Sequence, residues 1–118
     1  MNFLITGAAG FIGYHISIFL LKKKFTIYGL DDLNSYYDVQ LKKDRLKRLE
    51  KYKNFSFYKR KIEDKKLIST FRNKKIDIII NLGAQAGVRH SLKDPYSYIN
   101  SNVLAQVNML ELALHNVD

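Results

Sequence analysis

The sequence predicts an α/β fold built on a doubly wound parallel β-sheet, and three features of the chain support this prediction. Short apolar segments typical of buried strands alternate with longer segments of helical periodicity. Three glycines at three-residue spacing follow the first apolar segment directly. The last such segment, residues 76–82, is mostly apolar, as expected for a parallel strand that helices cover on both faces.

Each element can be placed from its periodicity. The first strand is expected at residues 3–6. The helix after it is indicated by apolar residues at helical spacing, namely Ile12, Ile16, Phe19 and Leu20. Further strands are expected at residues 25–30, 55–58 and 76–82. A charged segment at residues 37–52 is expected to form a surface helix, and right-handed crossovers then predict a βαβαβαβα unit with the strand order 3-2-1-4.

The last helix has the clearest start. Asp94 can cap the free backbone N–H groups, and Pro95 occupies the first helical position, where its missing N–H costs nothing. Five apolar residues then follow one stripe of helical spacing: Ile99, Val103, Val107, Leu110 and Leu114. We expect this stripe to be the core face of the helix.

The composition limits the class of protein. A chain of 118 residues with 47% hydrophobic residues is expected to form one domain, residues 1–118. Cysteine is absent, which excludes disulfides, thiolate metal sites and a cysteine nucleophile, and we expect a cytoplasmic location. The apolar residues 3–21 are interrupted by glycines and polar side chains and precede a basic cluster at residues 22–24. We therefore expect neither a signal peptide nor a membrane span.

The formal net charge of +9 raises the question of nucleic-acid binding. The basic residues are spread along residues 42–53, 59–66 and 72–75, as on solvated helix faces and turns, without a nucleic-acid motif or an aromatic stacking platform. We expect no nucleic-acid partner, because the charge would equally suit a small anionic ligand. The three histidines lack the spacing of a metal site or a catalytic triad, so no metal is expected.

The glycine-rich turn between the first strand and the first helix carries the main functional signal. Gly7 permits a tight turn, Gly10 lets the backbone approach a pyrophosphate, and Gly13 lets the helix pack closely on the sheet. The first N–H groups of the helix and its dipole then face the phosphates. Glycines can also simply break the start of a helix, but the strand before and the helix after indicate a Rossmann-type dinucleotide-binding unit.

The second strand is expected to end at Asp31, where a dinucleotide fold places the carboxylate that binds the adenosine ribose hydroxyls. A 2′-phosphate there would meet the negative charges of Asp31 and Asp32, and no arginine follows at the strand end. NAD is therefore the expected cofactor, in preference to NADP. For Asp32 a simple turn or capping role is the alternative.

Longer motifs refine this expectation. The spacing TGxxGxxG at residues 6–13 resembles that of extended short-chain dehydrogenases/reductases, in the NAD-dependent epimerase/dehydratase family. Residues 30–39, 82–92 and 98–102 are similar to the bacterial UDP-glucuronate 4-epimerases within it. The glycine motif is shared by many dehydratases, reductases and epimerases, whereas the tyrosine-rich segment after Asp31 and the motif AQAGVR are narrower. The resemblance covers essentially the whole chain, which corresponds to the N-terminal part of such an enzyme.

The resemblance implies that NAD contacts residues near the end of each strand. Those implied at the pyrophosphate are Gly7, Gly10, Phe11, Ile12 and Gly13. Those implied around the adenosine are Asp31, Asp32, Asn34 and Ile62, and those at the nicotinamide half are Leu82, Ala84 and Gln85. Asn102 is implied to reach the same cleft from the last helix, with a solvated helix residue as the alternative. Arg89 is a candidate for binding a uronate carboxylate or a phosphate of the substrate, or else a surface arginine on a loop.

Two positions depart from the family pattern. Asp32 stands where the family usually has asparagine, and Lys61 stands where it has an aspartate that contacts the adenine amino group. Lysine cannot accept this hydrogen bond. Adenine recognition would then depend on Glu63 or on backbone groups.

The resemblance implies the NAD-binding portion of a nucleotide-sugar epimerase, an isomerase that oxidises the sugar transiently at C4 and returns the hydride to its other face. UDP-glucuronate or UDP-galacturonate is the implied substrate, and a homodimer is expected for the full-length enzyme. The family's catalytic Tyr-x-x-x-Lys pair is absent from the 118 residues. This pair and the sugar-binding domain are expected outside the chain, which alone is expected to be inactive. The alternatives are another NAD-dependent epimerase or dehydratase of sugar nucleotides, and a non-catalytic nucleotide-binding module.

Overall fold

A computed structural model of the chain describes residues 1–34, 38–84 and 92–116. Four parallel strands form one sheet in the order β3-β2-β1-β4, which confirms the predicted Rossmann-type α/β fold and its order 3-2-1-4. The strands are β1 (Asn2–Thr6), β2 (Thr26–Asp31), β3 (Phe55–Lys59) and β4 (Ile78–Asn81).

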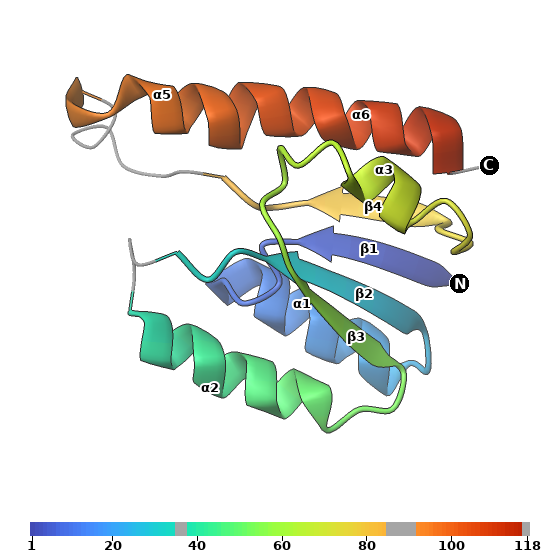
Figure 1. The fold of residues 1–118 in the computed structure, drawn as a ribbon. Helices are drawn as coiled ribbons and strands as arrows, with labels where there is room; N and C mark the ends of the chain where they lie inside the picture. The colour runs from blue at the N-terminus through green and yellow to red at the C-terminus, as the bar shows by residue number, and fades with distance from the viewer. Residues whose placement is uncertain (35–37, 85–91, 117–118) are drawn as a thin grey trace.

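Helices cover both faces of the sheet (Figure 1). The helical segments are α1 (Phe11–Lys22), α2 (Val39–Glu50), α3 (Leu67–Thr70), α5 (Pro95–Tyr98), the π-helical segment η1 (Ile99–Leu104) and α6 (Ala105–Asn116). Helices α1 and α2 lie on one face, whereas α3 and the continuous rod α5–η1–α6 lie on the other. Among the described helices, none combines the length and the apolar character that crossing a membrane needs.

Capping side chains determine where two of the helices begin. The Asp94 side chain accepts a hydrogen bond from the Ser97 N–H at 3.2 Å, and Pro95 is the first residue of α5, as expected. The Asp38 side chain accepts one from the Gln40 N–H at 2.9 Å. This cap accounts for the start of α2 at Val39, whereas residue 37, where the helix was expected to begin, lies outside the described residues.

The alternation of side chains along β1 divides the core into two layers. Phe3 and Ile5 pack on the side of α1 and α2, and Leu4 packs on the side of α3 and α6. The first layer is completed by Leu20, Leu21, Ile27, Leu46, Leu49 and Phe55. The second is completed by Leu30, Leu67, Phe71, Ile76, Met109 and Leu112. Together the layers fix the carboxyl ends of the strands relative to the starts of the helices.

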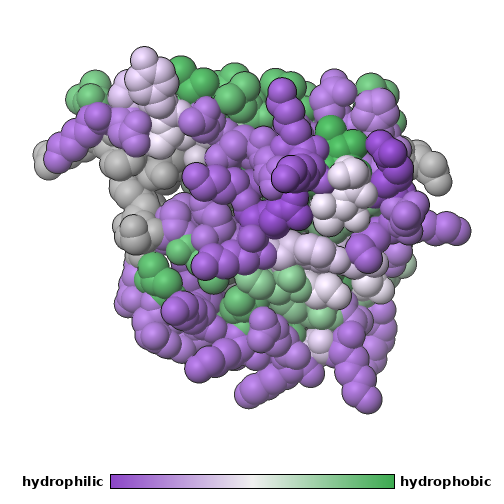
Figure 2. All heavy atoms as spheres, in the orientation of Figure 1, coloured by the Kyte–Doolittle hydropathy of each residue, from purple (hydrophilic) through white to green (hydrophobic). Residues whose placement is uncertain are grey.

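The prediction of which face of the last helix packs against the core is wrong. The stripe of Ile99, Val103, Val107, Leu110 and Leu114 is 49% to 73% exposed. The residues of α6 that are buried instead are Ala105, Asn108, Met109 and Leu112. The apolar residues of this helix lie on more than one of its faces, so periodicity alone does not select the buried face. In addition, the π-helical η1 changes the angular spacing of the residues before α6. The outward apolar side chains form the green band along the upper edge of Figure 2, over α5 and α6.

Small residues determine which face of α1 packs against the sheet. Its buried residues are Gly13, Ser17, Leu20 and Leu21, whereas Ile12 and Phe19 are exposed. The Ser17 hydroxyl donates to the Gly13 carbonyl at 2.6 Å and is thereby satisfied inside the core. The helix therefore approaches the sheet closely at its first turn, beside the glycine-rich turn.

Candidate functional site

A cleft of about 480 Å³ opens at the carboxyl ends of the strands, where parallel α/β sheets bind their ligands. Its lining comes from the end of β2, from the loops that follow the four strands, and from helices α1 and α2, with one residue from η1. The lining residues are Gly7, Gly10, Phe11, Ile12, Gly13, Asp31, Asp32, Asn34, Asp38, Leu41, Lys42, Arg45, Ile62, Glu63, Leu82, Gly83, Ala84 and Ser101.

The cleft brings together most of the residues that the sequence analysis assigned to a cofactor. They include the glycine turn, Asp31, Asp32, Asn34, Ile62, Leu82 and Ala84. Asn102 lies on η1 outside this lining, next to Ser101, which belongs to it. Gln85 and Arg89 lie outside the described residues, so their roles stay predictions.

The glycine turn is held in a conformation that larger residues cannot adopt without strain. Gly7 has a φ of +67°, and a Cβ atom there would lie 2.9 Å from the Gly83 nitrogen. A Cβ atom on Gly13 would collide with the Gly7 carbonyl oxygen. No described side chain caps the start of α1 at Gly10, so the first N–H groups of the helix are available at the cleft.

Asp31 joins the end of β2 to the glycine turn. Its side chain is buried, and one carboxylate oxygen accepts from the Ala9 N–H at 3.1 Å. The other oxygen accepts from the Leu33 N–H at 2.8 Å. Each oxygen can accept a further hydrogen bond, so the carboxylate orders the turn and still has capacity for a ligand.

Asp32 forms a local turn with Asn34, two residues further along the chain. One of its oxygens accepts from both the backbone N–H and the side-chain amide of Asn34, each at 3.1 Å. This geometry matches the turn role that the sequence analysis kept as an alternative, and it fixes Asn34 at the mouth of the cleft.

Two cations of α2, which the sequence analysis did not assign to the site, also line the cleft. Lys42 is buried, and its ammonium group donates to the backbone and side-chain oxygens of Asn34 at 3.2 and 3.3 Å. Arg45 donates to the Ala9 carbonyl at 3.2 Å, and its guanidinium lies 5.9 Å from the ring centre of Phe11. The two residues lie about one helical turn apart near the start of α2. This spacing in the sequence could have indicated that they share one face of the helix.

Thr6 ties the end of β1 to the end of β4. Its hydroxyl donates to the Asn81 side chain at 2.5 Å and accepts from the N–H groups of Leu82 and Gly83, both at 2.9 Å. The chain after β4 therefore passes close to the glycine turn. A Cβ atom on Gly83 would meet the end of the Ile62 side chain, which would have to move aside.

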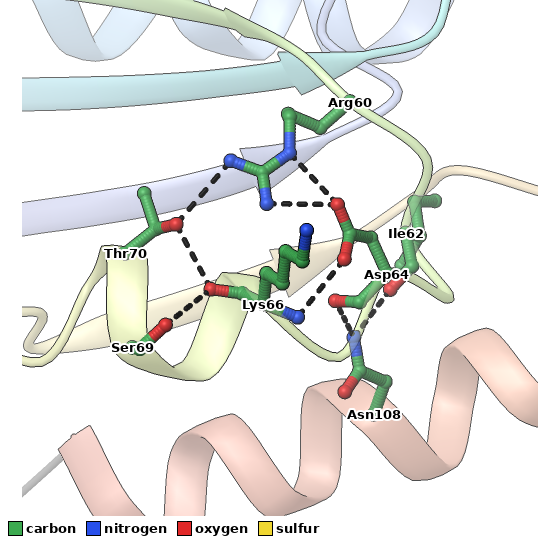
Figure 3. A network of polar contacts seen from close by, with 7 residues as sticks. All are labelled: Arg60, Ile62, Asp64, Lys66, Ser69, Thr70 and Asn108. Carbon is green, nitrogen blue, oxygen red and sulfur yellow. Dashed lines mark hydrogen bonds and ion pairs between the residues drawn. The ribbon is translucent and has the colours of Figure 1, made fainter.

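The loop after β3 brings Ile62 and Glu63 to the cleft, whereas Lys61 is exposed and does not line it. Figure 3 shows how this loop is held. The side-chain amide of Asn108, on α6, donates to the carbonyl groups of Ile62 at 2.6 Å and Asp64 at 2.8 Å. The two anchored carbonyls flank Glu63, so its backbone position is fixed from both sides.

Asp64 anchors the same loop through its side chain. One oxygen accepts from the Lys66 N–H at 2.9 Å, and the other accepts from two nitrogens of Arg60 at 2.9 and 2.8 Å (Figure 3). The hydrogen bond from the Lys66 backbone and then the Arg60 guanidinium hold the pKa of Asp64 below its ordinary value. Arg60 also donates to the Thr70 hydroxyl at 3.3 Å and so connects the loop to α3.

The chemistry of this arrangement favours binding of an extended anionic ligand over catalysis by the described side chains. The start of α1, two cations, and acidic and amide groups line the same cleft. The described residues contain no group of three or more metal-binding side chains.

Comparison with known protein families gives a match over nearly the whole chain. A family model described as GDP-mannose 4,6 dehydratase matches residues 4–117. Protein CapI of Staphylococcus aureus is 45% identical over 116 residues, which are 98% of this chain and 34% of that protein. UDP-glucuronate 4-epimerase of Thermodesulfobacterium geofontis is 45% identical over 111 residues, which are 93% of this chain and 34% of that enzyme.

Comparison with solved structures also gives similarity to a UDP-glucuronic acid 4-epimerase. The crystal structure of UDP-glucuronic acid 4-epimerase from Bacillus cereus, in complex with UDP-glucuronic acid and NAD, has 33% sequence identity and a TM-score of 0.87. The similarity covers 98% of this chain and 37% of that one. The chain thus spans about a third of the length of the relatives that it matches.

Proposed function

Because the chain belongs to the GDP-mannose 4,6 dehydratase family, we propose that it is the NAD-binding portion of a nucleotide-sugar epimerase. One observation carries the proposal: a single cleft combines the glycine turn at the start of α1 with the buried carboxylate of Asp31 at the end of β2. The similarity to an epimerase whose complex contains UDP-glucuronic acid and NAD supports the choice of reaction and cofactor.

The residues of the cleft fit a dinucleotide. The glycine turn presents backbone instead of side chains, and the uncapped start of α1 offers N–H groups and the positive end of its dipole to a pyrophosphate. Arg45 would add a positive charge beside this turn, to which it is hydrogen-bonded. When bound, NAD would supply the hydride acceptor for the transient oxidation of the sugar.

Asp31 would select NAD over NADP. Its carboxylate would accept from the adenosine ribose hydroxyls, whereas a 2′-phosphate would be repelled by Asp31 and by the neighbouring Asp32. Lys42 offsets part of this negative charge, but its ammonium group is already hydrogen-bonded to Asn34. The preference for NAD should therefore persist.

For the full-length protein we propose UDP-glucuronate or UDP-galacturonate as substrate, with Arg89 as the partner of the sugar carboxylate. Asn102 and Gln85 would border the nicotinamide half of the cofactor. A homodimer is supported by the exposed apolar stripe on α5–η1–α6, because large apolar patches commonly mark interfaces. A cytoplasmic location agrees with the absence of cysteine.

A dehydratase of sugar nucleotides is the second candidate, and the description of the matching family model favours it. Both candidates require a Tyr-x-x-x-Lys pair for proton transfer, which this sequence lacks. The 118-residue chain by itself should therefore bind the cofactor without converting a sugar.

Titration of the chain with NAD, NADP and UDP-glucuronate by calorimetry tests the proposal. We expect saturable binding of NAD that is tighter than that of NADP, and the Asp31→Ala variant should lose most of this difference. Asp44→Ala is the matched control, because Asp44 is exposed on α2 outside the cleft. Failure of the intact chain to bind any dinucleotide would contradict the proposal.

A further inference from the structure

We propose that Glu63 recognises the base of the bound dinucleotide by accepting a hydrogen bond from the exocyclic amino group of adenine. The inference rests on the proposed function, because it assumes that the cleft holds NAD. It assigns a residue to the role for which Lys61 is chemically unsuited.

The first argument is the place of Glu63 relative to the strands of the sheet. The glycine turn follows β1, Asp31 ends β2, and Glu63 follows β3, which lies next to β2 at the edge of the sheet. A ligand with its phosphates at β1 and a ribose at β2 extends its base toward the end of β3. Ile62 and Glu63 line the cleft there.

The state of the Glu63 side chain is the second argument. It is partly buried, and its carboxylate has no hydrogen bond or ion pair with any residue in the described part of the chain. The acidic side chains Asp31, Asp32 and Asp38 that line the same cleft each accept hydrogen bonds within the protein. Glu63 is thus the lining carboxylate that is left with its full capacity to accept from a ligand.

The rigidity of the loop is the third argument. Asn108 holds the carbonyl groups on both sides of Glu63, at 2.6 and 2.8 Å, and Asp64 ties the loop to Arg60 (Figure 3). A carboxylate on a loop fixed in this way loses little conformational freedom when it binds a ligand. This anchoring is what a specificity-determining side chain requires.

The chemistry of the two neighbouring side chains completes the assignment. An adenine amino group is a donor, and a carboxylate is purely an acceptor, whereas the Lys61 ammonium can only donate. Lys61 is also exposed and does not line the cleft. Ile62, between the two, would offer an apolar surface to the base.

Affinities for NAD and for nicotinamide hypoxanthine dinucleotide test the inference, because the analogue has a carbonyl oxygen in place of the amino group. We expect the intact chain to bind NAD about tenfold more tightly than the analogue, since a carboxylate facing a carbonyl oxygen loses a charged hydrogen bond. In Glu63→Gln the side-chain amide can donate to that oxygen, so the ratio should fall to about threefold or less. Lys61→Ala, the neighbouring exposed position, should keep the ratio of the intact chain.

The outcomes separate this inference from the function on which it rests. Absence of NAD binding by the intact chain would overturn the proposed function itself. Binding of NAD with equal affinity for the analogue, or an unchanged ratio in a folded Glu63→Gln, would overturn the role of Glu63 and leave the function standing. Circular dichroism of the variant establishes that it is folded.

Discussion

Replacement of Asn108 by alanine should destabilise the chain by about 2–3 kcal/mol, because it removes two hydrogen bonds of about 1 kcal/mol each and leaves their carbonyl partners unsatisfied. The side chain is buried in α6, and it donates to Ile62 and Asp64 across the boundary between the helix and the loop after β3. Domains of this size have about 5–15 kcal/mol of stability, so the loss would be a large fraction of the total.

Urea denaturation followed by circular dichroism measures this effect. With a slope of about 1–3 kcal/mol per molar urea, the midpoint should fall by roughly 0.7–3 M at unchanged slope. Asn100→Ala is the control, because Asn100 is exposed on the same helical rod, and it should change stability by no more than about 0.5 kcal/mol.

A second variant separates the hydrogen bonds from the loss of side-chain volume. Asn108→Asp keeps the shape of the side chain but replaces a donor by an acceptor that faces two carbonyl oxygens. It should be at least as unstable as Asn108→Ala at neutral pH and should recover stability when the carboxylate is protonated. A folded Asn108→Asp with the stability of the intact chain would refute the assigned role of the amide.

Three further variants test the turn, the loop and the outer face. Gly13→Ala places a methyl group against the Gly7 carbonyl, so we expect a fall in melting temperature together with weaker NAD binding, and unchanged values would contradict the packing of α1. Because the pKa of Asp64 is lowered in the folded chain, its ionised carboxylate stabilises the fold at pH values above its ordinary pKa of 3.8. This contribution is lost as the pH falls through the pKa of the folded state. Asp64→Asn should therefore be less stable than the intact chain at neutral pH, with a difference in thermal unfolding that shrinks as the pH falls below 3.8; a constant difference would argue against the ion pair. Val107→Glu with Leu110→Glu should reduce self-association in sedimentation experiments, because both side chains are exposed apolar groups, and an unchanged mass distribution would exclude this face as the contact.

The sequence by itself determined the elements whose signals are local. Apolar runs bounded by glycine predicted the strands, and the spacing of Gly7, Gly10 and Gly13 predicted the turn that begins α1. Asp31 was predicted at the end of β2, and Asp94 at the start of α5. These features depend on the φ, ψ and hydrogen-bonding needs of a few adjacent residues, so the chain specifies them without its distant parts.

Only the tertiary structure decided which face of the last helix is buried. Its apolar residues occupy more than one face, and the choice of Met109 and Leu112 over Val107 and Leu110 depends on contacts with α3 and the sheet. A π-helical segment before α6 shifts the phase further, and nothing in the periodicity of the sequence predicts it.

The tertiary structure also decided which polar residues surround the cleft. Arg45 reaches the Ala9 carbonyl across 36 residues of sequence, and Asn108 reaches the Ile62 carbonyl across 46. Such pairs have no local pattern, since a helix brings any residue of its inner face to whatever the sheet order places beside it. The sequence therefore predicted most of the residues that line the cleft, and the packing of α2 and α6 determined which charges and amides join them there.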